Sequence, residues 1–262
     1  MKLNMFRIAM LSCLTVILIF FINIFLSPII FTDPRRLWPS ILSDEARFAV
    51  FLSLLTATCS TLISLIVGIP AAYALSRLNF PGKTVIEGFL DVPMAVPPIA
   101  FGVMLLIFFA RTPVGAFINE SVVRFIFEIP GIVLAQFSVI SILTIKFVKS
   151  SFDGIPVCYE RIARTFGYSE LESFFYVTLP SAKRGILGAA LMSWARALGE
   201  FGATVTLAGA TRFKTETLPI ALYLNLSTAN LENVAALTLI LLLIACLILT
   251  VSRKLLYRGF AS

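Results

Sequence analysis

The chain has 262 residues, of which 59% are hydrophobic and 13% charged, about half the charged share of soluble domains. One soluble fold of this size cannot hide so many apolar side chains from water, so the composition indicates a membrane protein. The formal charge of +7 would suggest a nucleic-acid partner in a soluble protein, but here the bases are spread thinly among long apolar runs. The absence of histidine excludes Ser-His-Asp catalysis and the HExxH zinc site. The four cysteines show no metal-ligand spacing, so no metal site is expected.

Six stretches are long and apolar enough to cross a bilayer core, which takes about 20 helical residues. They are residues 8–31, 48–76, 85–110, 132–148, 186–207 and 234–251. The first is too long for the apolar part of a signal peptide and no A-x-A site follows it, so we expect a helix there. Pro93, Pro97 and Pro98 predict that the third is broken or begins late, near Ile99. Two interpretations of that break stay open: a kinked helix lining a pathway, and a tilted entry loop.

The connections between these stretches predict the orientation of the chain. With the N-terminus inside, 13 of the Lys and Arg residues fall in cytoplasmic segments and 7 fall outside. Both termini are therefore predicted to lie in the cytoplasm, and the whole excess of positive charge lies on that side.

The longest cytoplasmic connection, residues 150–185, begins with an amphipathic pattern. Tyr159, Ile162, Ala163 and Phe166 repeat at i, i+3, i+4 and i+7, which predicts a short helix. Gly167 follows directly and is a favourable C-terminal stop.

A second short helix is expected after it. Ser169 and Glu172 fit the S-x-x-E capping box, and Pro180 is expected to end the helix. The apolar stripe of two such helices must be covered, either by the protein's own helix ends or by a partner.

These residues resemble the EAA loop of binding-protein-dependent ABC transporter permeases. Gly167 is followed, after nine residues, by Val177-Thr178-Leu179-Pro180, which is similar to the family's I-x-L-P. The family's Glu-Ala-Ala triplet aligns with Arg161-Ile162-Ala163, and Glu160 stands one position early. By resemblance the segment from Tyr159 to Gly167 docks in a groove of an ATPase subunit, with Glu160, Arg161 and Arg164 as a charged rim. The residues assigned to this coupling loop are Tyr159, Glu160, Arg161, Ile162, Ala163, Arg164, Phe166, Gly167, Val177, Leu179 and Pro180.

The fifth apolar stretch contains two charges. Arg196 and Glu200 are spaced i, i+4 on one helical face near the middle of the stretch. Each charge at that depth costs about 2.5–3.5 kcal/mol on insertion scales, so the two are expected to pair or to face a wet cavity. Two interpretations remain: a structural ion pair in a helix of small residues, or a role in transport.

The surrounding string A-R-A-L-G-E-F-G-A resembles the molybdate, tungstate and sulfate branch of these permeases, most of all the molybdate and tungstate subgroup. The pathway or gate residues assigned in this way are Arg196, Gly199, Glu200, Phe201 and Gly202. The resemblance covers residues 48–255, the permease core, within one integral-membrane domain, residues 1–262.

The resemblance implies an all-α fold with six transmembrane helices and a coupling-helix loop, the type I ABC importer permease. It implies a transport subunit rather than an enzyme, which imports molybdate or tungstate by alternating access in the inner membrane of a prokaryote. The implied partners are a second copy of the chain, two cytoplasmic ATPase subunits, an extracytoplasmic oxyanion-binding protein and membrane lipid, and no nucleic acid. This chain would bind no cofactor, and ATP and Mg would lie on the ATPase, because Gly82-Lys83-Thr84 lacks the upstream glycine of a phosphate loop. A sulfate importer permease and a passive anion channel are the alternatives.

Overall fold

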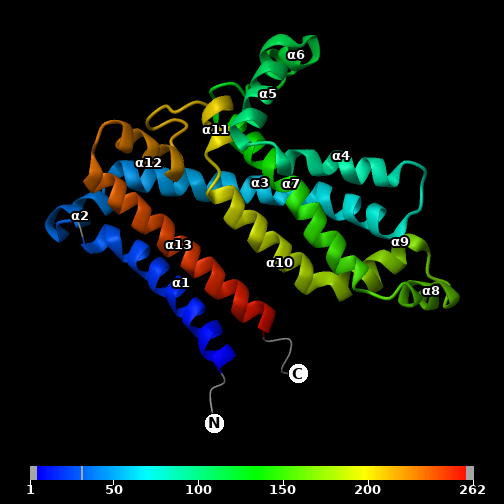
Figure 1. The fold of residues 1–262 in the computed structure, drawn as a ribbon. Helices are drawn as coiled ribbons and strands as arrows, with labels where there is room; N and C mark the ends of the chain where they lie inside the picture. The colour runs from blue at the N-terminus through cyan, green and yellow to red at the C-terminus, as the bar shows by residue number, and fades with distance from the viewer. Residues whose placement is uncertain (1–4, 31, 258–262) are drawn as a thin grey trace.

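A computed structural model describes residues 5–30 and 32–257, and helices are the regular secondary structure of these residues (Figure 1). The helices are α1 (Met5–Ile30), α2 (Pro34–Ile41), α3 (Asp44–Arg77), α4 (Lys83–Ala95), α5 (Pro98–Arg111), α6 (Pro113–Ser121), α7 (Ile129–Asp153), α8 (Cys158–Thr165), α9 (Glu170–Ser173), the π-helix η1 (Phe174–Thr178), α10 (Leu179–Leu198), α11 (Gly202–Leu207), α12 (Leu218–Ser227) and α13 (Leu231–Tyr257). The predicted all-α membrane fold is confirmed.

Four of the described helices are long and apolar enough to cross a membrane, and they match four of the six predicted stretches. They span Arg7–Ile30, Asp44–Arg77, Ile129–Asp153 and Leu231–Val251. The pair α4 and α5 makes a fifth if the two count as one bent span. The count of six stays a prediction.

The third predicted stretch is broken, as its prolines indicated. α4 ends at Ala95, α5 begins at Pro98, and the two helices are bent by 108°. Val96 and Pro97 are extended, with ψ of 131° and 135°, because a residue that precedes proline avoids the helical region.

The fifth predicted stretch, residues 186–207, is not one continuous helix, so that prediction is wrong. α10 ends at Leu198, where Gly199 caps it, and α11 begins at Gly202. The free backbone of the break is stabilised locally, since the amide of Ala203 donates to the carboxylate of Glu200 over 3.0 Å.

The core of the molecule is the packing of α3 along α7, with α10 against both. Ala189, Ser193 and Ala197 of α10 are all buried, and the Ser193 hydroxyl lies 2.8 Å from that of Thr144 in α7. This row of small residues lets the helices approach closely.

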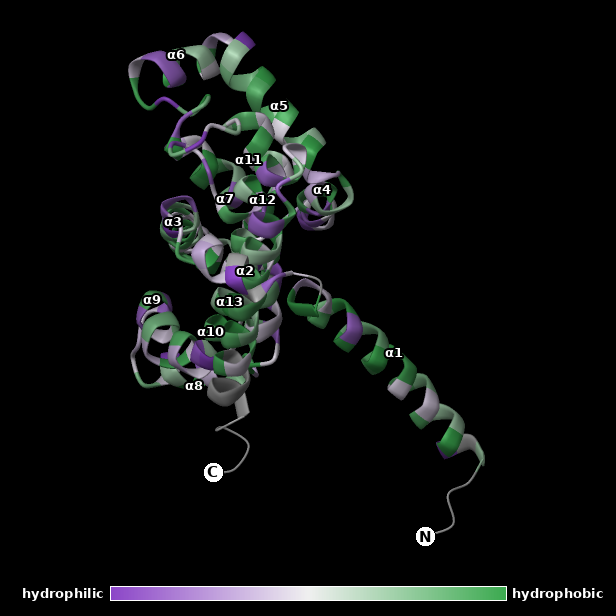
Figure 2. Cartoon of the chain, turned by 90° about the vertical axis from the view of Figure 1, so that its left-hand side faces the viewer, coloured by the Kyte–Doolittle hydropathy of each residue, from purple (hydrophilic) through white to green (hydrophobic). Residues whose placement is uncertain are grey.

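The remaining elements surround this core unevenly. α1 carries no buried side chain among those described, and it extends away from the body as a largely hydrophobic helix (Figure 2). α8 and α9 lie at one end of the molecule, whereas α2 and α12 lie at the other (Figure 1). α3 runs between these two ends.

Candidate functional site

The first helix expected in residues 150–185 forms where the sequence predicted it. α8 covers Cys158–Thr165 and stops before Gly167, which has a φ of 91°. That left-handed conformation suits glycine, because other residues are strained there.

The two faces of α8 differ sharply in exposure. Tyr159, Ile162 and Phe166 are exposed, with Phe166 at 79%, and we call these three the α8 exposed face. Ala163 was predicted to belong to this face, but it is buried, as is Glu160. At about 100° per residue, Ala163 lies at the edge of the exposed face, about 40° from Tyr159 and about 60° from Glu160, so it can be buried together with Glu160.

The sequence had suggested that Glu160 lies on a charged rim of α8, but the structure places its side chain inside the molecule. Its Oε1 accepts hydrogen bonds from Arg77 Nε over 2.9 Å and from Thr178 Oγ1 over 2.6 Å, and its Oε2 accepts one from Tyr73 over 3.1 Å. The Arg77 and Glu160 side chains are only 7% and 11% exposed. Arg161 and Arg164 remain exposed.

The second helix begins as predicted but does not end at Pro180. Ser169 and Glu172 make the full capping box, which lowers the pKa of the Glu172 carboxyl through hydrogen bonds from Ser169. The chain then stays helical from Glu170 to Leu198 (Figure 1). Proline is tolerated here because η1 precedes it, where the amide of Leu179 reaches back five residues to the carbonyl of Phe174.

The assigned residues of this second segment lie along η1 and the start of α10. Val177 and Leu179 are half-buried and Pro180 is exposed, whereas Thr178 is fully buried against Glu160. The loop therefore presents α8 outward and connects it directly to α10.

The two charges of the fifth predicted stretch pair with each other, one of the two arrangements expected. Arg196 Nη1 lies 2.7 Å from Glu200 Oε2, with the arginine side chain 39% exposed and the carboxylate 1% exposed. Glu200 stands in the break after α10, so the pair joins the end of that helix to the turn before α11.

All five residues assigned to the pathway line one cavity of about 350 Å³. Pro97, Pro98 and Ile99, at the break between α4 and α5, line the same cavity. A Cβ on Gly202 would come within 2.9 Å of the backbone nitrogen of Ile99, so glycine allows this close approach. The third and fifth predicted stretches are thus both broken at one place.

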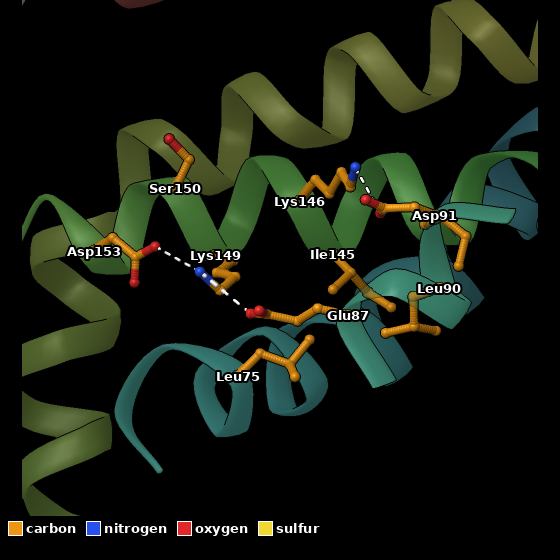
Figure 3. Close-up of a pocket in the computed structure, with 10 residues that line it drawn as sticks. Leu75, Glu87, Leu90, Asp91, Ile145, Lys146, Lys149, Ser150 and Asp153 are labelled. Atoms are coloured by element: carbon orange, nitrogen blue, oxygen red, sulfur yellow. Dashed lines mark hydrogen bonds and ion pairs between the residues drawn. The ribbon is translucent and has the colours of Figure 1, made fainter. Parts of the chain in front are cut away.

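A second cavity, of about 360 Å³, lies between α3, α4 and α7 (Figure 3). Lys146 is 2.6 Å from Asp91, and Lys149 lies 3.6 Å from Glu87 and 3.0 Å from Asp153. Three carboxylates against two ammonium groups leave no positive field for an anion. No role was predicted from the sequence for these five residues, although the rule that charges within apolar stretches pair is a signal for this cluster.

The sequence did not reveal the partners of Glu160. No role was predicted for Tyr73, Arg77 or Thr178. Tyr73 and Arg77 are spaced i, i+4 at the end of α3, but nothing in the sequence shows which carboxylate they meet.

Residues 62–262 match the family described as binding-protein-dependent transport system inner membrane component. The molybdenum transport system permease protein ModB of Escherichia coli K12 is 35% identical over 201 residues, 75% of this chain and 86% of its own length. A probable molybdenum ABC transporter permease protein of Haloferax volcanii is 34% identical over 213 residues, 81% of this chain and 77% of its own. The molybdate/tungstate transport system permease protein WtpB of Thermococcus kodakarensis is 36% identical over 156 residues, 60% of this chain and 58% of its own.

The fold is similar to that of a bacterial ABC transporter that imports the acidic polysaccharide alginate. The TM-score is 0.75 at 15% identity, covering 97% of this chain and 96% of that chain. The same alginate transporter, in complex with an alginate-bound periplasmic protein, gives a TM-score of 0.75 at 14% identity, covering 95% of this chain and 94% of that chain.

Proposed function

The chain belongs to the family of binding-protein-dependent transport system inner membrane components, and on this basis we propose that it is the membrane subunit of an ATP-driven importer of molybdate or tungstate. The observation that carries the proposal is the 34–35% identity, over three quarters or more of the chain, to permeases named for molybdenum transport. The similarity to WtpB, which is named for molybdate and tungstate transport, supports the inclusion of tungstate in the proposal. Selection of the anion falls to an extracytoplasmic binding protein.

The proposed assembly is a homodimer of this chain, with two ATPase subunits in the cytoplasm and the binding protein outside. The α8 exposed face supports the ATPase contact, because three large side chains beside Arg161 and Arg164 suit a helix that docks in a groove. ATP and Mg belong to the ATPase, and both termini of this chain face the cytoplasm.

The proposed cycle is alternating access. ATP binding brings the two α8 helices together and favours the outward-open state, into which the binding protein releases its anion. A shift of the equilibrium from 1:99 to 99:1 needs about 5.5 kcal/mol of differential affinity for ATP. The helical path from Glu170 to Leu198, about 40 Å long at 1.5 Å per residue, ends beside Arg196 and so connects the docking loop with the cavity.

In this cycle Arg196 attracts the anion weakly and Glu200 limits its field. A pathway that held the anion tightly would not release it, and the neutral pair at 2.7 Å is compatible with weak attraction.

The test is transport in liposomes that contain this chain together with its ATPase and binding-protein partners. We expect ATP-dependent accumulation of molybdate and tungstate, measured by the metal content of the vesicles, and no accumulation without the binding protein. A complex that accumulates sulfate but neither metal oxyanion would establish the sulfate alternative. Anion flux that needs neither ATP nor the binding protein would establish a passive channel and overturn the proposal.

A further inference from the structure

One buried carboxylate attaches α8 to the rest of the molecule. Glu160 and Ala163 are the buried residues of α8, and Ala163 offers only a methyl group. Both oxygens of Glu160 are used: Oε1 by Arg77 and Thr178, Oε2 by Tyr73. The side-chain contacts that hold α8 against the rest of the molecule therefore depend on the Glu160 carboxylate.

Arg77, the cation of the pair, also donates hydrogen bonds to two groups of the protein. While Arg77 Nε donates to Glu160, its Nη2 donates to the carbonyl of Ile155 over 2.9 Å, in the turn between α7 and α8. A hydrogen-bonded pair of this kind, 7% and 11% exposed, holds its geometry, because separating the charges would leave each of them buried without compensation.

Arg77 is the last residue of α3, and the other end of this helix meets different elements. There the amide of Leu218 donates to Ser53 Oγ over 2.7 Å, and Asn225 Nδ2 donates to Glu45 over 2.6 Å. Both donors belong to α12, which lies at the opposite end of the molecule from α8 (Figure 1). α3 thus connects the docking helix with α12 through hydrogen bonds at both ends.

We propose that the Arg77–Glu160 pair is the contact through which movement of α8 drives α3, a second transmission route beside the continuous path into α10. The inference rests on the proposed function, since it assumes that an ATPase moves α8. Arg77 and Glu160 are positioning residues: they do not touch the ATPase or the anion, and the exposed Arg161 and Arg164 are left for the docking rim.

The experiment uses the full complex with the variants Glu160→Gln and Arg77→Gln, and the charge exchange Arg77→Glu with Glu160→Arg. Lys183→Gln is the matched control, because it removes one exposed charge from the cytoplasmic end of α10. Three quantities are measured: the ATPase that co-purifies, the stimulation of ATP hydrolysis by molybdate-loaded binding protein, and the ATP-dependent change in amide hydrogen exchange of α12.

We expect each single variant to retain the ATPase while its stimulation falls about tenfold and its α12 exchange no longer responds to ATP. The charge exchange is expected to recover part of both signals, and Lys183→Gln to behave as the wild type. Tyr73→Phe removes one hydrogen bond and leaves the ion pair, so it is expected to give a smaller loss with normal assembly.

Two results would overturn the inference. Normal stimulation and a normal α12 response in both single variants would show that the pair transmits nothing. Loss of the ATPase together with stimulation, in Tyr73→Phe as well as in Glu160→Gln, would show that the pair only maintains the docking helix. If the wild type responds to ATP at α12 but accumulates no metal oxyanion, the proposed substrate fails while the transmission route is still tested.

Discussion

Two buried carboxylates of this protein pair with an arginine, and a third accepts a hydrogen bond from a backbone amide. Glu160 and Glu200 each meet an arginine, at 2.9 and 2.7 Å. Glu216, in the segment between α11 and α12, is fully buried and accepts one hydrogen bond, from the amide of Phe213 over 2.8 Å. Burial raises the pKa of Glu216, and the neighbouring Glu45 raises it further. The folded protein therefore holds a proton on Glu216 more tightly than the unfolded chain does.

This difference predicts a pH dependence of stability. A raised folded-state pKa makes the free energy of unfolding fall as the pH rises from the ordinary value of 4.5 through the folded value, with no further change above it. Glu216→Gln is expected to flatten this part of the profile and to raise the melting temperature at neutral pH. Glu120→Gln, which removes an exposed carboxylate of α6, is the control. A variant with the wild-type profile in detergent would contradict the assignment.

The Arg196–Glu200 pair allows the two interpretations of its role to be separated. Arg196→Ala leaves Glu200, 1% exposed, without its cation, and an uncompensated buried charge costs about 3–5 kcal/mol. We expect uptake to fall while the ATPase still co-purifies. The double variant Arg196→Gln with Glu200→Gln removes the uncompensated charge. If the double variant is expressed as well as the wild type but does not take up the anion, Arg196 acts on the anion. If the double variant recovers uptake, the pair is structural.

At the level of elements, the contact between α5 and α11 depends on the absence of side chains. A Cβ on Gly102 would lie 2.7 Å from the Cα of Ala203, which is backbone and cannot move aside cheaply. Together with Gly202 against Ile99, this brings the two interrupted stretches to one cavity. A methyl group on either glycine would push α5 away from α11.

Gly102→Ala is therefore expected to destabilise the protein by about 1–3 kcal/mol, the usual cost of overpacking. Gly88→Ala in α4 is the matched control, because a Cβ there meets nothing within 4 Å and alanine favours a helix. Thermal unfolding in detergent measures both variants. Equal melting temperatures for the two would show that α5 and α11 are not closely packed.

At the level of the whole molecule, large apolar side chains are exposed at the end that carries α8. No other described residue of this chain covers them there. The α8 exposed face is one such surface, and it lies outside any long apolar helix. A charge placed there must be desolvated when a groove closes over it, which weakens docking.

Ile162→Asp combined with Arg161→Glu is accordingly expected to reduce the co-purified ATPase by about tenfold or more, a loss of about 1.4 kcal/mol or more of binding free energy. Leu42→Asp is the control, since Leu42 is an exposed leucine beside α2 at the opposite end of the molecule. A fully assembled and active double variant would rule out docking through α8.

Sequence reasoning predicted the membrane class, four long helices, the break at Pro97, α8 with its stop at Gly167, and the pairing of Arg196 with Glu200. These features follow from local rules, because hydrophobic length, proline geometry and i, i+4 spacing involve neighbouring residues. Only the tertiary structure decided that Glu160 turns inward to Arg77, 83 residues away, that η1 lets the helix continue past Pro180, and that two broken stretches meet at one cavity. Those features depend on which distant groups share a buried space. A buried charge, or a backbone group left without its helical hydrogen bond, is stabilised by the partner that the fold brings to it.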